Sequence, residues 1–400
     1  MPIGHPIFWL LLAAVLAPLL AQIPVGLKVP VVVLEVVLGI VIGPHVLDLV
    51  RFEGILEPMF RFGMAATLFM AGLELDFGAM KGRPLSLALG GWGISLLLGV
   101  AVVGLLHIVP GVDAPMMVVL AVSTTGLGVL LPLLRDGGRL DTFFGRMVLA
   151  AGTVGEVAPI AAMALLLSRR YSTWQEFGFL IAFVCILGVA IAVGLGARPP
   201  RILALLGREM KSSTQLPVRI ALLIIAALFV LAEEFGFESI FGVFAAGMVI
   251  GQSTRGAAGA PLREKLEGLT FGWFYPFFFV GAGIHFDLST LARDWTTALS
   301  VPLFAVLFLL VRGSTFLLYR KDFAVAEQLP FALLSSVPSL SIVVVITEIG
   351  VKAGHMNTQL AAALVGAALL CTLLYPTLAG TLMRPVTEST GSASAKVSGG

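Results

Sequence analysis

The sequence has little charge. Only 12% of its 400 residues are Asp, Glu, Lys or Arg, whereas 58% are hydrophobic. Because a soluble domain carries roughly 25% charged residues, this composition excludes a soluble protein and predicts a polytopic membrane protein. The net charge of +2 is too small to indicate nucleic acid binding, and no long basic run supplies that charge locally.

The sequence also lacks the motifs of several common sites. Its two cysteines, Cys185 and Cys371, both lie in apolar runs, and we interpret them as small core residues. No GxxxxGK[ST], HExxH or CxxC pattern occurs, which argues against ATP hydrolysis and against structural zinc. We therefore expect no cofactor and no enzymatic activity.

Apolar runs separated by charged or Pro/Gly-rich breaks predict an all-α membrane protein with about thirteen transmembrane helices. These helices are expected near residues 7–22, 29–47, 58–75, 85–108, 115–134, 143–168, 175–196, 217–234, 238–252, 269–285, 296–319, 328–349 and 358–383. The connections are too short for a separate soluble domain. The polar, low-complexity residues 384–400 are expected to form a disordered tail.

Lysine and arginine are distributed unevenly between the connections. Connections after odd-numbered helices hold fifteen of them, and connections after even-numbered helices hold five. Because positively charged connections stay in the cytoplasm, this asymmetry predicts an external N-terminus and a cytoplasmic C-terminus.

Three short matches recur in order at nearly constant spacing. "LGIVIG" (38–43) resembles "AGMVIG" (246–251), and "AGLELDF" (71–77) resembles "AGIHFDL" (282–288), at offsets of 208 and 211. "STTGLG" (123–128) lies 212 residues before "SSVPSL" (335–340). The matches predict two repeats of six helices, inverted because the first enters from outside and the second from inside. Inverted repeats are typical of secondary transporters that work by alternating access.

Two predicted helices contain polar interruptions at equivalent places in the repeats. "VSTTGLG" (122–128) places Ser123, Thr124 and Thr125 in the fifth helix, next to glycines. "LSSVPSLS" (334–341) places serines and a proline in the twelfth; those we single out are Ser335, Ser336 and Ser339. Proline removes a backbone donor, and hydroxyls can satisfy freed backbone groups. We interpret the stretches as a pair of broken, crossing helices at one site; the alternative is that small residues merely allow close packing.

Glu156 lies in the middle of the sixth helix, in "LAAGTVGEVAPIAAMALLL" (149–167), with no other ionisable residue within nine positions. A charge at that depth costs about 2.5–3.5 kcal/mol on insertion scales and usually marks an ion or proton pathway. A carboxyl that is neutral in one state and ionised in another can exchange a proton for a cation. The alternative is a permanently protonated glutamate that bonds a neighbouring helix.

Two further charges lie within predicted helices. Arg312 is either a fixed core cation, paired with a carboxylate or with helix-end carbonyls, or a side chain that extends to the cytoplasmic end of its helix. Glu35 precedes a short helix, and we expect it at an edge.

Several strings resemble the monovalent cation–proton antiporter superfamily, in the branch with bacterial Na⁺/H⁺ antiporters and potassium-efflux proteins. They are "VPVVVLEVVLGIVIGPHVL" (29–47), "FMAGLELDF" (69–77), "STTGLGVLLPLL" (123–134), "FGVFAAGMVIG" (241–251) and "FYPFFFVGAGIHFDL" (274–288). The resemblance implies the Na⁺/H⁺ antiporter fold in a homodimer, and a cell membrane location, the inner membrane in bacteria. It implies a scaffold and dimerisation domain (1–75 and 217–285), a core transport domain (85–168 and 296–383) and a linker helix (175–196).

The resemblance also locates an ion site, with two departures from the family pattern. The family's ion-binding pair, two acidic residues or Asn/Gln followed by Asp, falls at Gly155 and Glu156 here. Arg312 falls where electrogenic members carry a lysine. With one carboxylate in the pair, exchange of two protons is unsupported.

We therefore expect an antiporter that exchanges Na⁺ or K⁺ for H⁺ electroneutrally, with Glu156 as the shared carrier and the six hydroxyls as ligands or lining. Its partners would be a monovalent cation, a proton, the lipid bilayer and a second copy. One alternative is a sodium-coupled symporter of an organic anion, which Arg312 and helix N-termini would bind. Another is a sensor or channel in which Glu156 is structural.

Overall fold

The computed structural model describes residues 4–23, 29–51, 53–74, 82–106, 115–140, 142–167, 212–234, 239–255, 259–286 and 295–383. Every regular element in these ranges is a helix. The linker helix expected at 175–196 and the tail 384–400 lie outside the described residues, so the total of thirteen helices stays a prediction.

The N-terminal half has α1 (Gly4–Ala21), α2 (Val31–Ile42), α3 (Leu56–Glu74), α4 (Arg83–Leu106), α5 (Pro115–Val122), α6 (Leu127–Asp136) and α7 (Phe143–Leu167). The C-terminal half has α10 (Leu216–Glu234), α11 (Ser239–Ser253), α12 (Ala260–Leu269), η1 (Thr270–Phe274), α13 (Tyr275–His285), α15 (Trp295–Phe308), η2 (Leu309–Gly313), α16 (Phe316–Tyr319), α17 (Val325–Ser335), α18 (Leu340–Lys352) and α19 (Thr358–Leu382).

Within the described residues, six helical segments are long and apolar enough to cross a membrane, and four shorter apolar helices accompany them. The protein is therefore a multi-pass membrane protein. The span expected near 269–285 is helical, but the helix is longer than the span, since it begins at Ala260 and continues through the π-turn η1 to His285. Its first ten residues, "APLREKLEGL", carry charges that a search for apolar runs excludes.

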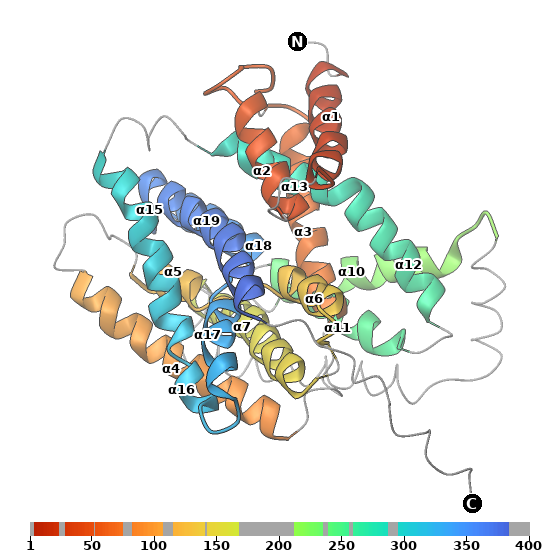
Figure 1. Cartoon of the computed structure of the whole chain (residues 1–400). Helices are drawn as coiled ribbons and strands as arrows, with labels where there is room; N and C mark the ends of the chain where they lie inside the picture. Colours follow the sequence, from red (N-terminus) through yellow and green to blue (C-terminus); the bar gives the residue numbers. More distant parts are fainter. Residues whose placement is uncertain are drawn as a thin grey trace, which may run out of the picture.

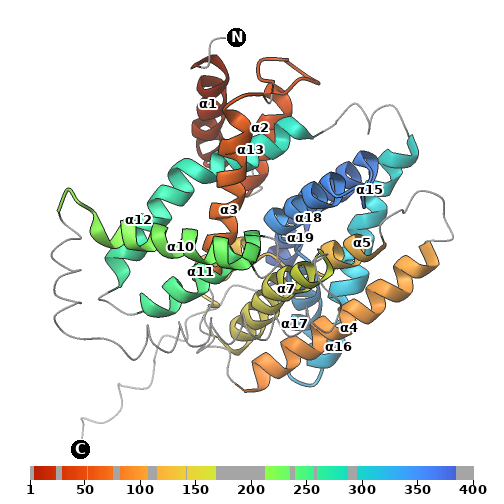
Figure 2. The same cartoon turned by 180° about the vertical axis from the view of Figure 1, so that it is seen from behind.

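The helices pack in two groups. One consists of α1–α3 and α10–α13, and the other of α4–α7 and α15–α19. Figures 1 and 2 show α1, α2 and α13 gathered on one side of the molecule and α4, α16 and α17 on the other. Helix α3 contacts both groups, through α11 and α13 in the first and α18 and α7 in the second.

Glycines at two helix crossings hold the first group together. A Cβ atom on Gly39 of α2 would lie 2.1 Å from the carbonyl oxygen of Val280 in α13, and one on Gly283 would lie 2.1 Å from that of Val36. Helices α3 and α11 cross in the same way at Gly72 and Gly247, where the corresponding distances are 2.2 and 2.1 Å. Only glycine permits such close backbone approach. These four glycines are among the six that the first two pairs of repeated strings share, so the sequence matches mark two similar crossings.

Candidate functional site

The polar interruptions in two helices meet in the second group. Helix α5 ends at Val122 and α6 begins at Leu127, while α17 ends at Ser335 and α18 begins at Leu340. Both helices are thus broken at the predicted stretches.

The two breaks are bonded to each other. The amide of Gly126 donates to the carbonyl of Val337 at 2.9 Å, and the hydroxyl of Thr125 donates to the carbonyl of Ser335 at 2.6 Å. A Cβ atom on Gly126 would lie 2.8 Å from the carbonyl oxygen of Pro338. Glycine at position 126 therefore lets the two breaks cross in direct contact.

Glu156 lies on α7 beside this crossing, with 6% of its surface exposed. The hydroxyl of Ser339 donates to its Oε1 at 3.2 Å, and the backbone amide of Leu127 donates to the carboxyl as well. Ser339 is the N-cap residue of α18, and Leu127 is the first residue of α6. The carboxyl thus faces the N-termini of two half-helices, which carry partial positive charge. Within the described part of the chain, no lysine or arginine forms an ion pair with it.

The six predicted hydroxyls are all buried, but their contacts differ. Only Ser339 contacts Glu156. Three line the breaks and donate to carbonyls of their own helices: Ser123 to Leu120, Thr124 to Ala121, and Ser336 to Ala332. Ser335 is placed to donate to Ala332 and, at 3.4 Å, to the carbonyl of Arg312. Of the six, Ser339 is therefore the one whose side chain hydrogen-bonds Glu156, and the others line the breaks.

Arg312 lies on the π-turn η2 and is 2% exposed, so its side chain does not extend to the helix end. Its Nε donates to the Thr125 hydroxyl at 2.7 Å, its Nη2 to the Ala151 carbonyl at 3.0 Å, and its Nη1 to the Ser95 hydroxyl at 3.4 Å. Among the described residues no carboxylate pairs with it. Of the two alternatives, the buried position is that of a core cation, and the partners of its three nitrogens are one carbonyl and two hydroxyl oxygens.

Gly155 lies between Arg312 and the first break. Its carbonyl accepts from the amide of Thr125 at 2.9 Å. A Cβ atom at this position would lie 2.7 Å from Nη2 of Arg312 and 2.7 Å from the Thr125 hydroxyl. The position next to Glu156 in the sequence is therefore filled by another residue's guanidinium.

Sequence reasoning missed some contacts and misplaced one charge. Ser95 of α4 is fully buried, bonds the carbonyl of Val311 at 3.1 Å and reaches Arg312; a single serine within an apolar stretch gave no signal for this. Glu35 is only 6% exposed on α2, so the expectation of an edge position was wrong. Burial on α2 depends on the packing of α1 and α13, which the sequence does not reveal.

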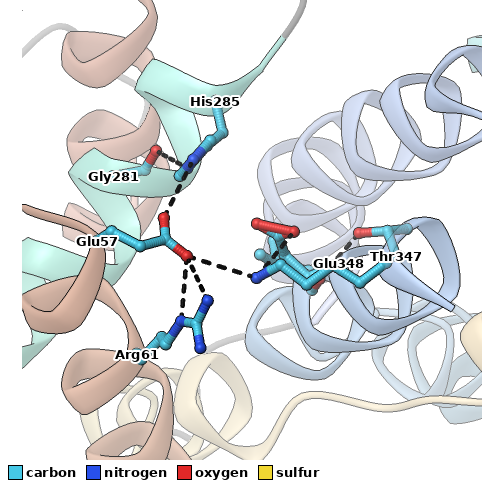
Figure 3. A network of polar contacts seen from close by, with 8 residues as sticks. Glu57, Arg61, Gly281, His285, Thr347 and Glu348 are labelled. Carbon is cyan, nitrogen blue, oxygen red and sulfur yellow. Dashed lines mark hydrogen bonds and ion pairs between the residues drawn. The ribbon is translucent and has the colours of Figure 1, made fainter. Parts of the chain in front are cut away.

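A charged cluster joins the two helix groups away from Glu156 (Figure 3). Glu57 of α3 accepts a hydrogen bond from Arg61 at 3.0 Å and lies 4.0 Å from the ring of His285 on α13. Lys352, the last residue of α18, reaches Glu57 Oε1 at 3.8 Å and also Glu348 at 3.8 Å. This cluster forms an electrostatic contact between α3 and α18.

Comparison with known proteins identifies the family. Residues 11–384 match the family described as the sodium/hydrogen exchanger, transmembrane. The chain belongs to this family. Its members are transporters, so the chain is not an enzyme.

Individual relatives are distant. Cation/H⁺ antiporter 19 of Arabidopsis thaliana is 28% identical over 254 residues, which are 60% of this chain and 31% of that protein. An Na⁺/H⁺–K⁺ antiporter of Bacillus cereus is 26% identical over 275 residues, covering 68% of this chain and 69% of that protein. The chain spans only 31–56% of the length of five curated relatives that match it, antiporter 19 among them.

The fold is similar to that of a solved structure, the sodium proton antiporter of Methanocaldococcus jannaschii. The TM-score is 0.64, with 96% of this chain and 98% of that chain covered and 16% of residues identical. The similarity therefore extends over nearly the whole chain.

Proposed function

We propose that the protein exchanges Na⁺ or K⁺ for H⁺ across a cell membrane by alternating access, with Glu156 as the carrier of both ions. The observation that carries this proposal is the position of Glu156: a buried carboxyl at the crossing of two broken helices, facing two helix N-termini. A carboxylate and a serine hydroxyl offer the oxygen ligands that Na⁺ and K⁺ prefer. Unwound backbone next to a site is also the usual place of ion binding in secondary transporters.

The charges near the site favour electroneutral exchange. Arg312 is a fixed cation with three protein oxygens around it, and Glu156 is the carboxyl at the crossing. When Glu156 carries either a proton or a monovalent cation, the two loaded forms have the same net charge. One proton would then leave for each cation that enters.

The finer architecture is part of the same proposal. The group α1–α3 and α10–α13 would be the scaffold, through which two copies form a homodimer, and the group with the crossing would be the moving core. The matching glycine crossings at Gly39 and Gly247 support an inverted repeat of six helices, within a total of thirteen. The Lys and Arg asymmetry supports an external N-terminus and a cytoplasmic C-terminus.

The test is cation-dependent proton movement in proteoliposomes, with Na⁺ and K⁺ supplied separately. Glu156→Gln should abolish exchange, because the amide neither titrates nor carries charge, whereas Glu156→Asp should keep part of it. Glu35→Gln is a matched control, since Glu35 is equally buried but lies on α2 in the other helix group. Full exchange in Glu156→Gln would refute the assignment.

A further inference from the structure

Gly155 has no side chain, and the guanidinium of Arg312 occupies the space in which a side chain at this position would begin. An added Cβ atom would lie 2.7 Å from Nη2 of Arg312, well inside van der Waals contact. It would lie equally close to Cβ and Oγ1 of Thr125, and Thr125 belongs to the first break. No side chain can therefore be added at position 155 unless the arginine and the break both move.

The guanidinium joins elements that are far apart in the sequence. It bonds α4 through Ser95, α7 through the carbonyl of Ala151, and the first break through Thr125. The Thr125 hydroxyl then donates to the carbonyl of Ser335, and the Ser335 hydroxyl lies 3.4 Å from the carbonyl of Arg312. These bonds form a closed ring through η2, the first break and the end of α17.

From this arrangement we infer that Gly155 and Arg312 are a matched pair of positioning residues. The glycine provides the space, and the guanidinium placed there holds the first break so that the amide of Leu127 faces Glu156. Because the guanidinium occupies this space, position 155 has no room for a second carboxylate beside that of Glu156. The effect on cation binding rests on the proposed function, whereas the packing of the pair does not.

Lysine should replace Arg312 poorly. The three guanidinium nitrogens point to three different elements in one plane, whereas an ammonium is a point charge with no such fork. Arg312→Lys keeps the positive charge but cannot hold all three partners in place. It also removes the nitrogen nearest to position 155, and so leaves room on that side for an added methyl group.

The experiment compares Gly155→Ala, Arg312→Lys and the double variant with Gly152→Ala as control. Gly152 lies one turn earlier on α7, and the three atoms nearest to an added Cβ atom there are side-chain carbons of Leu127 and Leu130, at 3.2–3.4 Å, with no backbone atom among them. Two quantities are measured for each protein: the thermal unfolding midpoint in detergent, and the apparent cation KM with the maximal rate in proteoliposomes.

We expect Gly155→Ala to lower the unfolding midpoint and to raise the cation KM about tenfold, while Gly152→Ala changes both little. Arg312→Lys should itself cause a loss in both quantities. In the double variant the methyl group no longer meets Nη2 but still meets Thr125, so the combined loss should be smaller than the sum of the two single losses. Such coupling between two substitutions is the mark of direct contact. Strictly additive effects, or a Gly155→Ala protein that matches the wild type, would overturn the inference.

The two readouts separate this inference from the proposed function. If the wild type exchanges no cation while the unfolding midpoints are coupled, the proposed function fails and the packing of the pair stands. If the midpoints are coupled but every variant keeps the wild-type cation KM, the positioning role is refuted and the contact is structural only.

Discussion

The hydroxyl of Ser339 donates a hydrogen bond to Glu156 across 3.2 Å, although 183 residues separate the two in the sequence. This bond connects the N-cap residue of α18 to the middle of α7. It makes Ser339 the one member of the six predicted hydroxyls that can respond directly to the ionisation of Glu156.

Replacing Ser339 by alanine should weaken cation binding and leave the fold intact. A hydrogen bond to a charged group contributes about 1.5–3 kcal/mol, so the apparent cation KM should rise at least about tenfold. Ser336→Ala is the matched control, because the Ser336 hydroxyl donates to the Ala332 carbonyl in its own helix. Transport assays on both variants check the prediction, and an equal KM in the two would contradict it.

Proton and cation should compete if they share Glu156. Each ion must leave before the other binds, so lowering the pH should raise the apparent cation KM by up to about tenfold per pH unit. At sufficiently high pH the KM should become constant, because the carboxylate is then already ionised. The measurement is cation KM against pH in proteoliposomes. A constant KM throughout the active range would indicate separate proton and cation sites.

Exchange should carry no net charge. In the proposed mechanism one carboxyl serves both ions, and Arg312 keeps its charge in both loaded forms. Recordings on solid-supported membranes should therefore show no transport current when a cation gradient is imposed, while a pH-sensitive dye in parallel vesicles reports proton movement. A current whose sign follows the cation gradient would contradict one-for-one exchange.

The glycine crossings should tolerate no side chain. In Gly72→Ala the new Cβ atom would lie 2.2 Å from the backbone carbonyl of Phe244, which cannot rotate away. Overpacking of this kind destabilises by about 1–3 kcal/mol or more, so the unfolding midpoint should fall. Gly90→Ala is the control on α4, where an added Cβ atom meets nothing within 4 Å. Equal midpoints for the two variants would show that α3 and α11 can separate without loss.

The contact between Glu57 and Lys352 should contribute modestly. Both side chains are partly exposed, at 35% and 49%, and their charged atoms are 3.8 Å apart. Exposed pairs are worth about 0–1 kcal/mol and weaken in salt. Lys352→Ala should therefore lower the unfolding midpoint slightly at low ionic strength and not in 1 M salt. In a double-mutant cycle with Glu57→Ala, the two losses should be less than additive at low ionic strength; strictly additive losses would argue against the pair.

Local chemistry explains why much of the architecture was predictable. Hydrophobic runs report membrane burial directly, because each helix satisfies its own backbone groups within the bilayer. Pro338 and the neighbouring serines, and the glycine at position 126, disturb the helical backbone where they stand, so both breaks were found. The charged residues 260–269 behave in the opposite way: they form a helix that is not apolar, and hydropathy missed it.

Composition, periodicity and backbone-breaking residues act locally, so they were enough to indicate a multi-pass membrane protein with two broken helices and with Glu156 in the middle of a long apolar stretch. Which groups meet could be seen only in the folded arrangement. It joined Ser339 to Glu156, turned Arg312 to Thr125 and away from any described carboxylate, and placed its guanidinium in the space that Gly155 leaves. It also buried Glu35, which the sequence suggested at an edge. Contacts between side chains from separate helices depend on the angle at which the helices cross and on the rotamers of the two side chains. Neither quantity can be read from the residue pattern of a single sequence.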